Sequence, residues 1–295
     1  VINSAVRYNS GVSKEISAGQ INPIERNMLT NVIHFDTRFK QNYTVNDSKF
    51  TFKFPTSFKN VISIKLLSFE LPETIYNVTT NFGNRTFSIY VGNTASVTAA
   101  RNVDTIITLD EGKYTKATLL SEIQAKLIAN VDSNFTASEN DADSGLIGIR
   151  NTSGLDFTLK FPGIKDRVNL GYILGFANEN IRSSASAGNR DAIGTKVPDF
   201  DFNNYIYLSL DDYQMSVNQN HYAVMNKNFV TKNIFAKLKN KSDESNTDYF
   251  IRKKYFGPVT LERVTFELLD RYGNSLDLKG LDYSFSIEIE ILYKY

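Results

Sequence analysis

The side chains that most often perform nucleophilic or acid–base chemistry are few in this sequence. It holds two histidines, His34 and His221, and no cysteine. A serine–histidine–aspartate triad would need one of these histidines beside a positioned serine and a carboxylate. Neither histidine lies in a known nucleophile motif, and no Gly-x-Ser-x-Gly occurs. We therefore interpret both as surface or hydrogen-bonded structural residues and expect no catalytic residue.

Two acidic groups have the residue types for calcium binding or proton transfer. Asp199-Phe200-Asp201-Phe202-Asn203 begins like a calcium loop, but an EF-hand then needs glycine at its sixth position and glutamate at its twelfth. Asn204 and Leu210 occupy those positions, which leaves at most a loose surface ion site, so we expect no metal-binding residue. The pair Asp211-Asp212 follows an alternating strand, where we expect both carboxylates to be solvated.

Basic side chains gather in one late stretch that could contact nucleic acid or an acidic neighbouring subunit. The stretch comprises Lys227, Lys232, Lys237, Lys239, Lys241 and Arg252-Lys253-Lys254. Asp243, Glu244 and Asp248 interrupt it, and the whole chain has a net charge of only +1. A solvated face is therefore the favoured interpretation, and we expect no direct nucleic-acid binding. Gly188 to Lys196 lacks the Gly-Lys-Ser/Thr order of a phosphate loop, and we expect no cofactor.

The composition indicates a strand-rich protein with a sizeable core. Of the 295 residues, 41% are hydrophobic and 13% are aromatic, carried by 21 phenylalanines and 16 tyrosines. Phenylalanine and tyrosine favour half-buried pleated sheets. The absence of cysteine excludes disulfides and thiolate metal sites. No apolar run is long enough for a membrane span, and no basic segment followed by an apolar one indicates a signal peptide.

Alternating hydrophobicity predicts strands along most of the chain. Residues 49–54 alternate phenylalanine with polar residues, and Pro55 should end that strand. The apolar phase slips at Leu66-Leu67, which predicts a β-bulge. The clearest further strands are 87–91, 106–109, 264–268 and 285–291, whereas 178–198 has the composition of a long exposed loop.

One segment has the spacing of a helix rather than a strand. Between Thr115 and Val131, the apolar residues fall three or four apart, and Thr115 is a plausible N-cap. The sequence therefore predicts a mainly all-β protein, an antiparallel jelly-roll β-sandwich with one amphipathic helix in an insertion. We expect an N-terminal arm at 1–30 and a sandwich at 31–295, with the helix-bearing insertion around 110–200.

Four segments are distinctive in their order along the chain. They are 31–42, Asn-Val-Ile-His-Phe-Asp-Thr-Arg-Phe-Lys-Gln-Asn; 50–72, an alternating strand ending in Glu-Leu-Pro; 111–127, Glu-Gly-Lys-Tyr-Thr and the helix, with Leu-Gly-Phe at 174–176; and 269–288, with Leu-Asp-Arg-Tyr-Gly-Asn and Leu-Asp-Tyr-Ser-Phe-Ser-Ile-Glu. Together they resemble jelly-roll capsid proteins of nucleocytoplasmic large DNA viruses, virophages and related virus-like transposons. The penton, or vertex, proteins are the most similar.

This resemblance implies a homopentamer at icosahedral vertices that contacts the major capsid protein and minor capsid proteins. It implies that the protein is part of a virion capsid that is assembled in the host cell. The resemblance provides no catalytic residue, so we do not expect this protein to be an enzyme. Two alternatives stay open: a minor capsid protein elsewhere in the shell, and a receptor- or carbohydrate-binding β-sandwich on the virion. A hydrolase on a jelly-roll scaffold lacks any motif.

Overall fold

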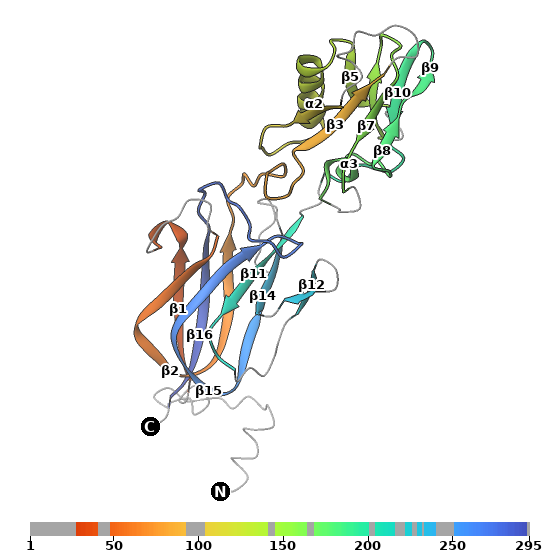
Figure 1. The fold of residues 1–295 in the computed structure, drawn as a ribbon. Helices are drawn as coiled ribbons and strands as arrows, with labels where there is room; N and C mark the ends of the chain where they lie inside the picture. Colours follow the sequence, from red (N-terminus) through yellow and green to blue (C-terminus); the bar gives the residue numbers. More distant parts are fainter. Residues whose placement is uncertain are drawn as a thin grey trace, which may run out of the picture. The chain divides into compact units, whose positions relative to one another are not determined.

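A computed structural model describes residues 28–40, 48–92, 104–140, 145–163, 168–200, 204–215, 222–225, 229–231, 233–239 and 251–293. The chain divides into two compact units. The sandwich unit comprises residues 1–71, 205–276 and 280–295, and the insertion unit comprises residues 72–204 and 277–279. Both units are built mainly from antiparallel strands (Figure 1).

The sandwich unit holds one hydrogen-bonded series of strands in the order β1-β16-β2-β15-β11-β14. Their bounds are β1 Met28–Asp36, β2 Phe50–Glu70, β11 Tyr205–Asp211, β14 Ile234–Lys239, β15 Arg252–Leu269 and β16 Ser284–Leu292. A short 3-10 helix, η2 (Thr37–Phe39), follows β1, and β12 (Ala223–Met225) pairs with β13 (Phe229–Thr231) as a separate hairpin.

Two very long strands bend, and each contributes to two layers. In β2, Asn60 has a positive φ of 58°, a conformation that asparagine tolerates, and it separates a first part, β2a (50–58), from a second, β2b (61–70). In β15 the register with β2 shifts between Lys254 and Val259, which separates β15a (252–254) from β15b (259–269). Such bulges let a strand change direction and pass from one sheet to another.

The bends create the strand order of a jelly roll. One layer runs β1-β16-β2b-β15a, and the other runs β2a-β15b-β11-β14. When the eight segments are numbered along the chain, these orders are 1-8-3-6 and 2-7-4-5, the two Greek keys of a jelly roll. The predicted antiparallel jelly-roll sandwich is therefore confirmed.

Aromatic rings fill the space between the two layers. The ring centroid of Phe266 in β15b lies 4.6 Å from that of Phe285 in β16 and 5.1 Å from that of Phe35 in β1. Phe266 and Phe285 are almost completely buried. Because successive residues of a strand face opposite sides, the alternation of Phe266, Leu268 and Val264 with polar residues places all three in this core.

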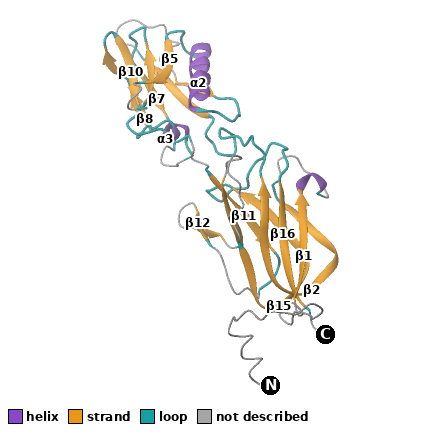
Figure 2. Cartoon of the chain, turned by 180° about the vertical axis from the view of Figure 1, so that it is seen from behind, coloured by secondary structure: helices purple, strands orange, loops and turns teal. Residues whose placement is uncertain are grey.

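The insertion unit packs helix α2 and two four-stranded sheets around a core of its own. The sheets run β5-β6-β10-β9 and β4-β3-β7-β8, and both views show α2 lying beside β5 (Figures 1 and 2). The bounds are β3 Thr86–Val91, β4 Asp104–Thr108, α2 Lys116–Asn130, β5 Phe135–Glu139, β6 Ile147–Asn151, β7 Phe157–Lys160, α3 Leu170–Ile173, β8 Asn180–Arg182, β9 Ser184–Ser186 and β10 Asn189–Ile193.

The predicted helix is confirmed together with its N-cap. The Thr115 hydroxyl accepts a hydrogen bond from the Thr118 backbone, and the Thr118 hydroxyl accepts one from the Thr115 backbone, a reciprocal cap. The apolar side chains at Leu119, Ile123 and Leu127 are buried, as the spacing predicted. The helix-bearing insertion expected around 110–200 lies within the insertion unit, which begins earlier, at residue 72.

A short segment near the end of the chain, 277–279, belongs to the insertion unit. The Lys279 ammonium lies 2.7 Å from a carboxylate oxygen of Glu111 and 2.7 Å from one of Asp277. Glu111 also accepts hydrogen bonds from the backbone and the hydroxyl of Thr80. The hydrogen bonds from Lys279 and Thr80 lower the pKa of Glu111 to about 2.

Two local expectations were wrong, the expected arm is described only at its end, and the expected bulge is confirmed. Pro55 does not end its strand. It lies in an irregular part of the register between β2 and β15, where its missing backbone N–H does not interrupt a hydrogen bond between the strands. Residues 178–198 form β8, β9 and β10 rather than an exposed loop, since their backbones pair although their side chains are polar. Residues 28–30 begin β1, and the rest of the expected arm lies outside the described residues. The Leu66-Leu67 bulge is confirmed.

Candidate functional site

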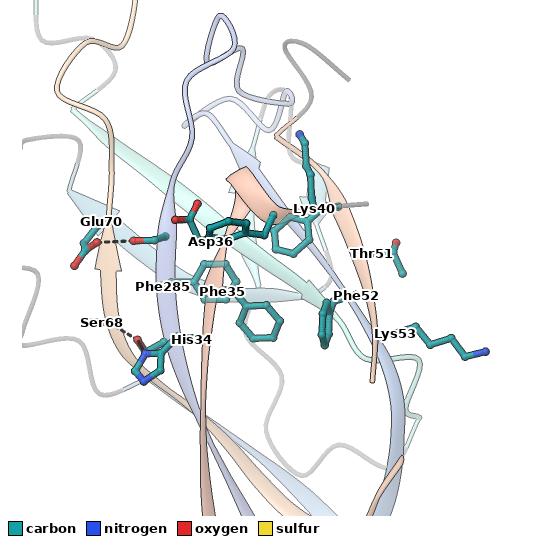
Figure 3. Close-up of a pocket in the computed structure, with 14 residues that line it drawn as sticks. His34, Phe35, Asp36, Lys40, Thr51, Phe52, Lys53, Ser68, Glu70 and Phe285 are labelled. Carbon is teal, nitrogen blue, oxygen red and sulfur yellow. Dashed lines mark hydrogen bonds between the residues drawn. The ribbon is translucent and has the colours of Figure 1, made fainter. Parts of the chain in front are cut away.

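The sandwich unit contains a groove that is lined by side chains of mixed chemistry. It has a volume of about 460 Å³ and lies where β1 and β2a, edge strands of different layers, leave the aromatic core accessible. Figure 3 shows Ser68, His34 and Glu70 on one side of the Phe35 and Phe285 rings. Phe52 and Lys53 lie on the other side. The groove therefore has an apolar floor and polar margins.

The floor consists of phenylalanine rings that contact one another. The ring centroids of Phe35 and Phe52 are 5.3 Å apart with an edge-to-face geometry, and those of Phe35 and Phe285 are 5.0 Å apart and stacked. Phe35 and Phe285 are buried, but Phe52 is 37% exposed and Phe39, on the η2 turn, is 80% exposed. Aromatic surface left open in this way can receive another ring at low cost.

The polar margin is occupied largely by hydrogen bonds within the chain. His34 Nδ1 lies 2.7 Å from Ser286 Oγ, which in turn accepts from Ser68 Oγ at 2.9 Å. Ser284 donates to Glu70, and Asp36 accepts from the backbone of Arg38. No carboxylate hydrogen-bonds His34 among the described residues, so the contacts of a serine–histidine–aspartate triad are not assembled around it there.

The neighbouring strand β1 carries apolar side chains on both of its faces. Met28, Leu29 and Val32 are 43%, 49% and 47% exposed, and within the described residues β1 pairs only with β16. An edge strand with unpaired backbone groups and large apolar side chains invites association with another chain unless it is covered. The groove and the edge of β1 together form a surface suited to binding protein, and we call it the β1 surface.

The other candidates from the sequence are dispersed or buried. His221 and Asp201 lie outside the described residues. Asp212, expected to be solvated, is 3% exposed; it lies 2.8 Å from the Lys253 ammonium and accepts a hydrogen bond from the Tyr255 hydroxyl. Burial, with the nearby Asp212 charge, raises the pKa of Tyr255, so this hydroxyl stays a donor. The cluster is structural because it fixes the bend of β15 to the end of β11.

The late basic stretch does not form one patch in the structure. Lys253 is paired with Asp212, and Arg252 lies 3.1 Å from Glu290 of β16, whereas Lys237 and Lys239 are on β14 of the other layer. Lys227, Lys232 and Lys241 lie outside the described residues. The solvated face expected from the sequence is therefore not found at Lys253, whose side chain is only 13% exposed.

In the part of the chain that the structure describes, no three metal-ligating side chains gather. None of the described helices is long and apolar enough to cross a bilayer.

Comparison with known proteins adds three findings. Residues 30–146 match a family of unknown function, DUF5901. No curated protein matches the chain. The crystal structure of the mavirus penton protein is similar over 90% of this chain and 99% of its own length, at 11% identity and a TM-score of 0.38.

A second solved structure, the Sputnik virophage determined by cryo-electron microscopy, is similar over 92% of this chain. The match covers 100% of the Sputnik chain, at 12% identity and a TM-score of 0.43.

The structure brings together segments that sequence reasoning could identify only one by one. Segments 31–42 and 269–288 contribute β1 and β16, which pair with each other, and 50–72 contributes β2, which pairs with β16. The alternation of phenylalanines in β2a predicted an inward face. Nothing local in the sequence signalled that Phe52 would stay partly exposed, because that depends on the gap between two layers.

Proposed function

We propose that this chain is a structural protein of a viral capsid that forms homopentamers at icosahedral vertices. In this role it contacts the major capsid protein and minor capsid proteins in a shell assembled in the host cell. The chain acts by shape and surface, not by catalysis. Fold alone does not establish such a role, so the proposal combines the sequence resemblance with the surface of the sandwich unit.

The observation that carries the proposal is the position of the resembling segments. Three of the four meet in the β1-β16-β2b part of one jelly-roll layer, although they come from opposite ends of the sequence. The exposed apolar edge at β1 also supports contact with other subunits, because a large apolar surface that stays exposed to water is unfavourable in a monomer and is commonly covered by a partner. The near-zero net charge fits a shell component better than a protein that packs nucleic acid.

The proposal is tested by the native mass of the purified protein over a range of concentrations. A vertex protein should give a species of five times the 33.3 kDa chain mass, alone or when mixed with the major capsid protein of its virus. A discrete dimer or trimer under both conditions would contradict the vertex position. A monomer that also fails to enter shells of the major capsid protein would contradict the capsid role.

A further inference from the structure

A second exposed apolar feature lies at the opposite edge of the same layer. In the order β1-β16-β2b-β15a, β1 forms one edge and β15a forms the other. Phe256 lies two residues after the end of β15a and is 84% exposed, the most exposed phenylalanine among the described residues. One layer therefore has an aromatic groove at one edge and a projecting aromatic ring next to the other.

The backbone that carries Phe256 is held firmly. Tyr255 is buried with its hydroxyl bonded to Asp212, and Lys253 contacts the same carboxylate at 2.8 Å. Val259 is buried on the other side of the bend. A large apolar ring displayed on an anchored bend loses little conformational entropy on binding, which is a property of residues that dominate interfaces.

We propose that Phe256 of one copy of this chain inserts into the groove of the β1 surface on the next copy. The partner is a second copy, because a projection and a groove on opposite edges of one layer form a head-to-tail contact, and such contacts close into rings when the rotation permits. The inserted ring would meet the edges of Phe35 and Phe52. This inference rests on the proposed function and names the surface through which the ring forms.

The chain's lack of cysteine permits a direct test by cross-linking. Lys53→Cys places a thiol at the groove, and Gly257→Cys places one beside Phe256, where an added side chain has open space and the backbone needs no positive φ. Mixing the two single variants with a short bismaleimide should give a cross-linked dimer containing one copy of each. The same reaction with Lys53→Cys and Ile106→Cys, a thiol at an exposed site in the insertion unit, should give none.

A second variant shows whether Phe256 itself carries the contact. Adding Phe256→Asp to the Gly257→Cys chain should abolish the cross-link. In the otherwise unmodified protein, Phe256→Asp should weaken self-association by at least about 30-fold, the effect of a dominant interface residue. Ile106→Asp, which changes another exposed apolar residue, 70% exposed, should leave the native mass unchanged. Circular dichroism checks that both variants fold.

The outcomes separate the two proposals. Pentamers that persist with Phe256→Asp and without the mixed cross-link would overturn the Phe256 contact and leave the vertex role standing. Cross-linked dimers of Lys53→Cys alone would show two grooves facing each other and would also overturn it. Saturable glycan binding in the groove that Phe52→Ala abolishes, with the mixed cross-link absent, would assign the groove to sugar instead. A protein that neither self-associates nor enters shells contradicts both proposals.

Discussion

The substitution Phe266→Ala should lower the free energy of unfolding of the sandwich unit by about 4 kcal/mol. The side chain is fully buried between the two layers, and truncating a buried phenylalanine costs about 3–5 kcal/mol. Its ring packs against Phe285 at 4.6 Å and Phe35 at 5.1 Å, and each aromatic pair contributes roughly 0.5–1.5 kcal/mol beyond burial. These contacts place the expected cost in the upper half of the range.

The matched control is Phe256→Ala, the same change on the same strand at an exposed position. At a protein concentration where the chain is monomeric, so that the proposed subunit contact does not contribute, Phe256→Ala should shift stability by less than about 0.5 kcal/mol. Hydrogen exchange read by mass spectrometry suits a protein with two units, because residues 72–204 serve as an internal reference. Protection should fall in β2, β15 and β16 and stay unchanged in the insertion unit. A cost under 1 kcal/mol for Phe266→Ala would refute the assignment of this ring to the junction between the layers.

Three further predictions concern charge and backbone. Asp212→Ala should cost the sandwich unit about 3–5 kcal/mol in urea unfolding, because it leaves the Lys253 ammonium buried without its partner; a change under 1 kcal/mol would contradict this. The carboxyl carbon of Glu111 should titrate by NMR near pH 2. Because its pKa lies below the unfolded value of 4.5, the stability that it contributes is present above pH 4.5 and is lost as the pH falls towards 2; a midpoint near 4.5 would contradict the contacts described. Gly175→Ala should cost more in thermal unfolding than Gly188→Ala. Both positions have positive φ, but only at Gly175 would the new carbon meet a backbone oxygen, at 2.1 Å; equal costs would exclude that clash.

The sequence predicted the strand-rich jelly roll because its core faces alternate clearly. The alternation at 264–268 and 285–291 and the helical spacing after Thr115 correspond to β15, β16 and α2. It could not predict β8, β9 and β10, whose backbone pairing depends on partners elsewhere in the insertion unit. Nor could it show that β2 continues past Pro55, since that depends on the register with β15.

Local sequence patterns could not predict the β1 surface either, for a similar reason. The exposure of Phe52 and Phe256 is decided by which strands end a layer, and that is a property of the topology. Asp212 shows the converse case. A carboxylate after a strand is usually solvated, but here the bend of β15 brings Lys253 and Tyr255 against it, so that Asp212 and Tyr255 are buried and Lys253 is partly buried.

The pairing of β1 with β16 also bears on how the protein is made. His34 and Ser286 lie side by side, yet 252 residues separate them in the chain. A ribosome therefore releases the residues between them before β1 can find its partner, whereas the strands at 72–204 can pair much earlier among themselves. The β1 surface exists only once β16 has emerged. Chains that stop short of β16 thus lack an assembled edge to offer to neighbours, so in the proposed capsid role the order of translation would exclude incomplete subunits.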